Sequence, residues 1–181
     1  MGQALADAFP VSRETLAEAD AALGESLTSV IFEGPEDRLT LTENAQPAIL
    51  AVSMAACRVL TAHGFAPAFV AGHSLGEYSA NVAAGTFGFA DALRTVRRRG
   101  RYMQEAVPVG SGAMAAVLGV DADVVEQACR DAAEGEVVSP ANINGAGQVV
   151  IAGARDAVAR AGARAKALGA RRSSAGFISA Q

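Results

Sequence analysis

Apolar residues recur at helical spacing through most of the first 110 positions of the chain. Ser12 is a candidate N-cap for a helix that ends at Gly24, and Pro47 suits the first turn of a longer helix. Residues 28–32 are rich in β-branched side chains and indicate a strand locally, although this run is too short to decide. Helices are predicted over 2–9, from Ser12 to Gly24, from Pro47 to Gly64, from the turn at 72–76 to Gly85, and over 89–104.

One nearly unbroken apolar run, residues 65–71, interrupts this helical pattern. Such a run is typical of a central parallel strand that is buried on both faces of a sheet. A strand of this kind needs neighbours, and the first 110 residues provide none unless residues 28–32 form one. We therefore expect an α/β unit that lacks most of its sheet.

A second pattern begins near residue 112, where short alternating stretches are separated by helical ones. It predicts the order βαββαβ, which is the split βαβ arrangement of ferredoxin-like folds. The strands are expected over 113–118, 136–143, 147–152 and 170–175, and the helices over 122–133 and 155–168. Asn142 and Asn144 have the spacing of residues on one strand face, but Asn144 and Gly145 also mark the hairpin turn, and turn chemistry alone explains these asparagines.

The two patterns meet near residues 108–112, a stretch that contains one proline and two glycines. We expect a domain boundary here. A cleft between the two units is the expected place for a binding site.

Composition narrows the class of protein. The chain has 181 residues, 51% of them hydrophobic and 19% charged, as in globular domains. Its net charge of -4 argues against binding to nucleic acid or to an anionic membrane, which would require clustered basic residues. No signal segment is visible, and no run approaches the roughly eighteen apolar residues of a membrane span. Cys57 and Cys129 lie in helical patterns, which favours buried free thiols over a disulfide or a metal site and fits a reducing cytoplasm.

The apolar run leads directly into a Gly-x-Ser-x-Gly sequence, with Ser74 at its centre and a helical stretch after it. A serine at such a strand-to-helix turn projects its Oγ, and the N–H groups that follow can face a developing oxyanion. Ser74 is therefore the candidate nucleophile. The alternative is that Gly72 and Gly76 only punctuate a turn.

The arginines of the predicted helix over 89–104 differ in their angle to its apolar stripe. At about 100° per residue, Arg94, Arg98 and Arg101 point away from the stripe, whereas Arg99 lies at its edge. Arg99 should therefore be partly buried, and a buried guanidinium requires an anion. That anion is either a ligand or a structural ion-pair partner. The other arginines of this helix are expected to form a solvated face.

Several motifs together resemble the malonyl-CoA:acyl carrier protein transacylase family over nearly the whole chain. They are Gly72-His73-Ser74-Leu75-Gly76-Glu77, then Arg99-Gly100 and Met103-Gln104, then Asn142-Ile143-Asn144. In that family a hydrolase-like parallel α/β core carries an inserted ferredoxin-like subdomain. The resemblance implies an incomplete core with the nucleophile elbow over 1–110, the subdomain over 111–175, and the start of the return to the core over 176–181. It also implies a short helix over 28–32, which we prefer to the local strand signal.

The resemblance implies a role for each matching residue. Ser74 would take the malonyl group from coenzyme A as an acyl ester, Arg99 would hold the free carboxylate, and the N–H of Leu75 would be one oxyanion donor. Gln46, in a Gln-Pro-Ala stretch like that of the family, would lie near the site. Met103, Asn142 and Asn144, as members of the matching motifs, are also candidate substrate-binding residues. His73 precedes the nucleophile in the family too, but neighbouring strand residues point to opposite sides, which favours a structural histidine over a base.

The implied partners are malonyl-CoA as the substrate and acyl carrier protein, whose phosphopantetheine thiol accepts the malonyl group. No bound cofactor and no metal is expected, and a complete family member is expected to be monomeric. The pathway is fatty acid or polyketide synthesis. The sequence does not choose between these pathways, nor between malonyl and methylmalonyl groups.

Two elements of the family are absent from the chain. It begins downstream of a Gly-Gln-Gly-Ser-Gln loop whose glutamine N–H completes the oxyanion hole, and it ends two residues short of the catalytic histidine. No histidine follows Ser74 anywhere. The chain is thus expected to be an impaired fragment of a transferase. A serine esterase fits the elbow alone but has no use for Arg99, and a non-catalytic binder of malonyl-CoA or carrier protein fits the lack of a base.

We predict that the 181-residue chain transfers malonyl groups to a carrier protein at a rate near background. Loss of one oxyanion donor costs about 10²–10³ in rate, and loss of a catalytic base costs several further decades. A transfer assay on the purified chain measures this rate, with a reaction lacking protein as the reference. Robust turnover would contradict the prediction.

Overall fold

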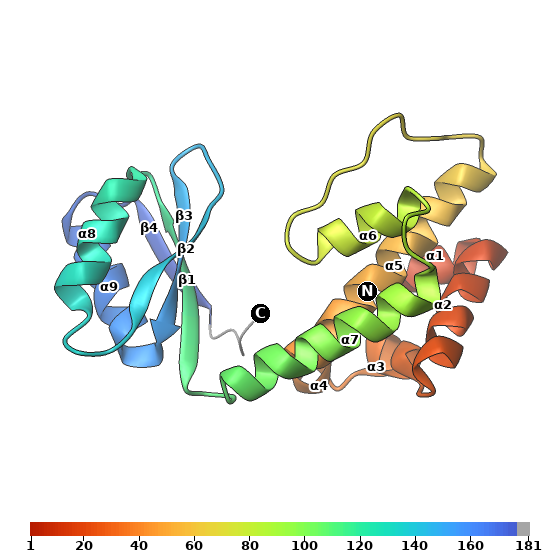
Figure 1. The fold of residues 1–181 in the computed structure, drawn as a ribbon, viewed down its shortest axis with the longest axis horizontal. Coiled ribbons are helices and arrows are strands. Elements are labelled where there is room, and N and C mark those ends of the chain that lie inside the picture. Colours follow the sequence, from red (N-terminus) through yellow and green to blue (C-terminus); the bar gives the residue numbers. More distant parts are fainter. Residues whose placement is uncertain (177–181) are drawn as a thin grey trace. The chain divides into compact units, whose positions relative to one another are not determined.

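The computed structural model describes residues 1–176, and Figure 1 shows their path from the N-terminus onward. The chain forms two compact units, Met1–Met103 and Gln104–Gln181. The predicted return to the core after Gly176 lies outside the described residues. Each unit has its own buried core of apolar side chains.

The first unit is helical throughout its regular structure. Its core gathers large apolar side chains from several helices, among them Leu16, Leu27, Leu50 and Leu93. The helices are α1 (Gln3–Ala8), α2 (Pro10–Leu23), α3 (Leu27–Glu33), α4 (Glu36–Thr40), α5 (Thr42–Ala62), α6 (Gly76–Ala83) and α7 (Phe89–Ala106), of which α7 continues into the second unit.

Residues 28–32 form part of α3, so the helix implied by the family resemblance is confirmed and the local strand signal was wrong. The buried residues Leu27, Val30 and Ile31 have the i, i+3, i+4 spacing of one helix face. The N–H of Thr28 donates to the carboxylate of Asp20 at 2.9 Å, which ties the start of α3 to α2. Packing of one apolar face therefore outweighs the β-branched composition.

The predicted cap at Ser12 was also wrong. Helix α2 begins at Pro10, whose fixed φ suits the first helical position, so Ser12 lies inside the helix. The Ser12 hydroxyl is buried, and no hydrogen-bond partner for it is found among the described residues.

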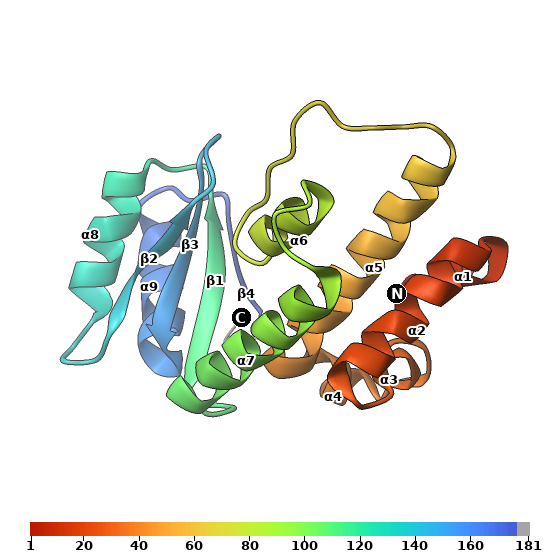
Figure 2. The same cartoon turned by 45° about the vertical axis from the view of Figure 1, so that its right-hand side comes forward.

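The predicted strand over 65–71 is not formed. Figures 1 and 2 both show the segment between α5 and α6 as an extended loop, and the side chain of Phe69 is 94% exposed. A strand exists only when its N–H and C=O groups pair with another strand. The described part of the first unit contains no other strand, so the apolar run stays unpaired.

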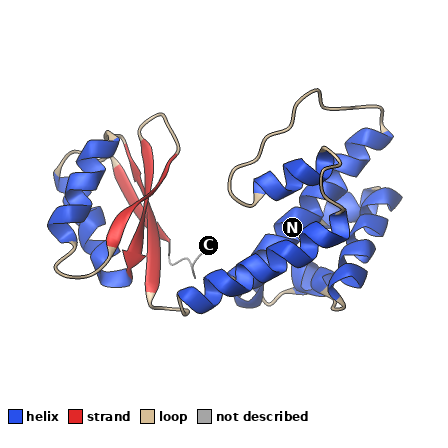
Figure 3. Cartoon of the chain, in the orientation of Figure 1, coloured by secondary structure: helices blue, strands red, loops and turns tan. Residues whose placement is uncertain are grey.

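The second unit has the βαββαβ order that the sequence predicts. Figure 3 shows its strands, in red, as one sheet. Their order in the sheet is β2-β3-β1-β4, and each neighbouring pair is antiparallel. The elements are β1 (Gly112–Leu118), α8 (Ala122–Ala132), β2 (Val138–Ile143), β3 (Gln148–Ala154), α9 (Arg155–Ala167) and β4 (Arg172–Gly176). Alternate β1 residues face α8 and α9, where Val117, Val125 and Val158 are fully buried.

Both cysteines are free thiols. Cys129 is buried in the core of the second unit, and Cys57 is half-buried on α5. Burial, followed by the nearby Glu126 carboxylate, raises the pKa of the Cys129 thiol above its ordinary value. The Cys129 thiol is therefore protonated and unreactive at neutral pH.

Among the described helices, α5 alone is long and apolar enough to cross a membrane, by length and composition only. The expectation that no segment reaches this length and composition was therefore wrong. Leu50, Ala51 and Met54 of α5 are buried in the core of the first unit. Burial in this core accounts for that face of the helix without a membrane.

Helix α5 begins at Thr42, five residues before the predicted start, so Pro47 lies inside it. Proline has no N–H, and the carbonyl of Glu43 therefore lacks the donor that an ordinary helix would supply. Arg97 of α7 takes this place, because its Nη1 donates to the Glu43 carbonyl at 2.9 Å. Packing against α7 thus allows α5 to continue through the proline.

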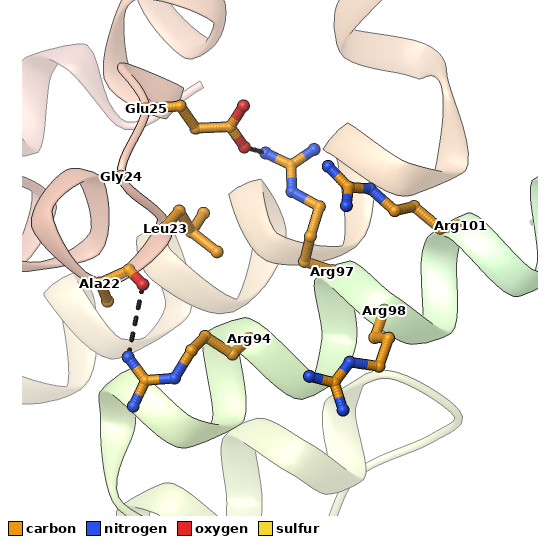
Figure 4. A pocket seen from close by; sticks show the side chains of 8 residues that line it. All are labelled: Ala22, Leu23, Gly24, Glu25, Arg94, Arg97, Arg98 and Arg101. Carbon is orange, nitrogen blue, oxygen red and sulfur yellow. Dashed lines mark hydrogen bonds and ion pairs between the residues drawn. The ribbon is translucent and has the colours of Figure 1, made fainter.

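The expectation that the other arginines of α7 form a solvated face was wrong for Arg97. Its side chain is buried, bonds to Asn44 at 2.5 Å and pairs with the carboxylate of Glu25. Figure 4 shows this pair at a pocket of about 300 Å³ that is also lined by three further arginines of the same helix. Those arginines are Arg94, which pairs with Asp91 at 2.7 Å, Arg101, which pairs with Glu43 at 3.6 Å, and Arg98, which has no carboxylate partner among the described residues.

We predict that Gly100→Ala destabilises the first unit by about 1–3 kcal/mol, as overpacking of a closed interface does. An added Cβ would lie 2.6 Å from both the Cα of Glu43 and the carbonyl oxygen of Thr42, so α7 would have to move away from α5. Denaturant unfolding followed by circular dichroism measures the change. Gly76→Ala is the matched control, because no atom lies within 4 Å of its added Cβ. Equal losses in both variants would contradict the packing argument.

Candidate active site

Ser74 lies in a tight turn immediately before α6, with a φ of 53°. This left-handed conformation is rare for a residue with a side chain and is costly unless its surroundings impose it. The turn is closed by the Gly76 N–H, which donates to the His73 carbonyl at 2.9 Å, and by the Glu77 N–H, which donates to the Ser74 carbonyl at 3.2 Å. A strained serine at the start of a helix is the geometry of a nucleophile elbow.

The two glycines of the motif have different roles. A Cβ on Gly72 would lie 2.0 Å from the backbone carbonyl of Gly76, so no other residue fits there. A Cβ on Gly76 would meet nothing within 4 Å. The close approach at Gly72 is therefore what shapes the turn around Ser74.

Leu75 follows Ser74 at the start of α6. Its side chain is buried in the core of the first unit, which anchors the first residue after Ser74. No acceptor for the Leu75 N–H is found among the described residues. N–H groups at the start of a helix are suited to stabilise negative charge.

Arg99 reaches the nucleophile. It is half-buried on α7, as its helical angle predicts, and its Nη2 donates to the Ser74 Oγ at 2.9 Å. The guanidinium carbon also lies 6.0 Å from the centre of the Tyr78 ring. No carboxylate pairs with Arg99 among the described residues, which weakens the structural ion pair as its explanation.

Gln46 holds the other side of Arg99. Its side chain is buried, and its Oε1 accepts from Arg99 Nη1 at 2.5 Å. Its Nε2 donates to the Thr42 Oγ1 at 2.8 Å and to the Met103 Sδ at 3.3 Å. Ser74, Arg99, Gln46 and Met103, four of the predicted site residues, therefore form one connected group.

The remaining predicted site residues lie elsewhere. His73 is an exposed residue of the turn next to Ser74. Asn142 is half-buried in β2, but Asn144 is exposed in the hairpin and its N–H donates to the Gln148 carbonyl at 3.0 Å. Strand β2 ends at Ile143, so Asn144 lies in the hairpin turn, as the turn chemistry of Asn144 and Gly145 favours, and the two asparagines do not share a strand face. Both belong to the second unit, and their relation to Ser74 stays a prediction.

Sequence reasoning missed two residues of this group, Thr42 and Tyr78. Thr42 precedes Gln46 by four positions on α5, and residues four apart share a helix face, so this spacing could have identified Thr42. Tyr78 lies in α6, whereas Ser74 precedes that helix in a left-handed turn, so helical spacing does not relate the two.

The surroundings of this group suit a small organic acid better than a metal. A pocket of about 340 Å³ adjoins Arg99 and Met103, and Thr95, Arg98 and Tyr102 complete its lining. Among residues 1–176, no three histidine, cysteine or acidic side chains are placed to hold a metal ion. The groups available for chemistry here are the Ser74 hydroxyl, the Arg99 guanidinium and the Leu75 N–H, for which no acceptor is found among the described residues.

Comparison with known proteins matches this chain to one family. The model of the acyl transferase domain family matches residues 1–177. The malonyl CoA-acyl carrier protein transacylase of Escherichia coli K12 is 55% identical over 169 residues, and that of Bacillus subtilis is 49% identical over 173 residues. These alignments cover 93% and 95% of this chain but 55% of each relative, so the chain spans about half the length of the curated relatives.

Solved structures agree with this match. The malonyl CoA-acyl carrier protein transacylase of Coxiella burnetii superposes with a TM-score of 0.94 at 43% identity, covering 99% of this chain and 57% of that one. A malonyl-transacylase solved in complex with its type II polyketide synthase acyl-carrier protein superposes with a TM-score of 0.91 at 50% identity. That alignment covers 97% of this chain and 57% of the solved chain.

Proposed function

This chain belongs to the acyl transferase domain family, and on that premise we propose that it carries a malonyl group from malonyl-CoA toward the phosphopantetheine thiol of acyl carrier protein. The observation that carries the proposal is Arg99, a half-buried cation without a carboxylate partner among the described residues, 2.9 Å from the Ser74 Oγ. A neutral acyl group has no use for such a cation. A malonyl group carries one free carboxylate that does.

The proposed reaction has two steps. The Ser74 Oγ attacks the thioester carbonyl of malonyl-CoA, the Leu75 N–H donates to the resulting oxyanion, and Arg99 binds the free carboxylate. The carbon–sulfur bond then breaks, and the proton of Ser74 leaves with the coenzyme A thiol. In the second step the pantetheine thiol attacks the ester carbonyl, the bond between that carbon and the Ser74 Oγ breaks as the new thioester forms, and the thiol proton returns to Ser74.

The further assignments are part of the same proposal. Residues 1–110 would belong to a hydrolase-like α/β core and residues 111–175 to a ferredoxin-like subdomain, with His73, Asn142 and Asn144 near the bound substrate. Acyl carrier protein would be the partner, and the malonyl-transacylase that was solved with an acyl-carrier protein supports this choice. The protein would act in the cytoplasm, in fatty acid or polyketide synthesis.

We expect malonyl-CoA to leave a malonyl ester on Ser74. Intact-mass spectrometry after long incubation detects a single acylation event even when turnover is slow. Ser74→Ala should remove the adduct, because no hydroxyl remains at the turn. An adduct of equal yield on Ser74→Ala would place the nucleophile elsewhere.

Arg99→Ala should lower acylation by malonyl-CoA about tenfold to a hundredfold and leave acylation by acetyl-CoA nearly unchanged. Hydrogen bonds to a charged group contribute about 1.5–3 kcal/mol, and only malonyl offers a carboxylate to this side chain. The rate of adduct formation with each thioester measures the effect.

Arg94→Ala is the matched control for this measurement. Arg94 also lies on α7, is exposed, pairs with Asp91 and makes no hydrogen bond to Ser74 or Gln46 among the described residues. Equal loss with both thioesters in Arg99→Ala would show that Arg99 does not hold the carboxylate. It would favour an esterase-like role for Ser74.

A further inference from the structure

We propose that Met103 and Thr42 are positioning residues that fix the side-chain amide of Gln46 and thereby aim Arg99 at the acyl carboxylate. This inference rests on the proposed function, because it explains how Arg99 would select an acyl group that carries a carboxylate. Neither residue contacts Ser74 in the structure. Both act through Gln46, which contacts Arg99 directly.

A glutamine amide can bind in two orientations, and its neighbours decide which one is stable. Its oxygen only accepts hydrogen bonds and its nitrogen only donates them. A guanidinium only donates, so the oxygen must face Arg99, as it does at 2.5 Å. In the opposite orientation two donors would face each other across that contact.

Met103 favours the same orientation of the Gln46 amide, from the other side of that amide. A thioether sulfur is a weak acceptor and never a donor, so it favours the orientation in which Nε2 faces it, as it does at 3.3 Å. The Thr42 hydroxyl both donates and accepts, so it holds the amide at 2.8 Å without deciding its orientation. Met103 therefore supplies orientation, and Thr42 supplies the second contact of the nitrogen.

The side chains of Gln46 and Thr42 are buried, which makes the loss of a hydrogen-bond partner costly. Gln46 is 5% exposed and Thr42 is 0% exposed, so water cannot replace a lost partner easily. All three polar positions of the amide, its oxygen and its two N–H groups, are used in the observed orientation. A turned amide would leave a buried mismatch and would push the guanidinium of Arg99 from its place.

The helix geometry places these residues in matched pairs. Thr42 and Gln46 are four apart on α5, and Arg99 and Met103 are four apart on α7. Gly100 lies next to Arg99 and lets α7 approach the first turn of α5, where a Cβ would meet Thr42 and Glu43 at 2.6 Å. The close contact of the two helices therefore brings both pairs around one amide.

The test compares Ser74 acylation by malonyl-CoA and acetyl-CoA in variants of the full chain. Met103→Leu removes the acceptor with little change in volume, and Thr42→Val removes the hydroxyl with its shape retained. Each is expected to lower the malonyl-to-acetyl rate ratio about threefold to tenfold, the value of one lost hydrogen bond. Thr42→Ser, which retains the hydroxyl, should restore the ratio.

Met54→Leu is the control for a purely structural effect. Met54 is buried in the core of the same unit and has no contact with Gln46 among the described hydrogen bonds. The malonyl-to-acetyl rate ratio of Met54→Leu should equal that of the wild type. A wild-type ratio in both Met103→Leu and Thr42→Val would overturn the inference and leave the proposed function standing. Equal acylation of the wild type by both thioesters would overturn the proposed function first and the inference with it.

A second measurement does not depend on how the variants fold. The side-chain amide protons of Gln46 in the wild type, assigned in nitrogen-15 spectra by their loss in Gln46→Met, should exchange slowly with solvent because both are bonded and buried. Exchange as fast as that of an exposed glutamine amide would overturn the inference.

Discussion

The close approach of α5 and α7 at Gly100 is the constraint on which the rest of the first unit depends. With no Cβ at this position, the backbone of α7 lies against Thr42 and Glu43, and two residues that precede Gly100 reach α5. Arg97 donates to the Glu43 carbonyl that Pro47 leaves without a partner. Arg99 donates to Gln46. One helix contact therefore serves both stability and the candidate site.

The two arginines of this contact differ in what surrounds them. Arg97 is enclosed by Glu25, Asn44 and the Glu43 carbonyl, and burial lowers its pKa while the carboxylates of Glu25 and Glu43 oppose that effect. The hydrogen-bond partners of Arg99 among the described residues are neutral, the amide of Gln46 and the hydroxyl of Ser74. Arg97 and Arg99 lie two residues apart on one helix, but only Arg97 pairs with a carboxylate in the part of the chain that the structure describes.

The spacing of apolar residues along the chain explains which features could be predicted from the sequence. The period of apolar residues fixes the βαββαβ order of the second unit, and the helical angle of Arg99 places it at the edge of a buried face. The run 65–71 has the composition of a buried strand, but a strand also needs a pairing partner, which composition cannot reveal. Arg97 was missed for a similar reason, because its burial comes from Glu25 and the start of α5, which are distant in sequence.

The bond between Arg99 and Ser74 also sets the direction of the serine O–H dipole. Because the Oγ accepts the Arg99 N–H at 2.9 Å, one of its lone pairs faces the cation and its own proton points away from it. The cation lies where negative charge would gather as that proton departs, so it favours the ionised oxygen. Any acceptor for the Ser74 proton would therefore lie on a side of the Oγ that the Arg99 guanidinium does not occupy.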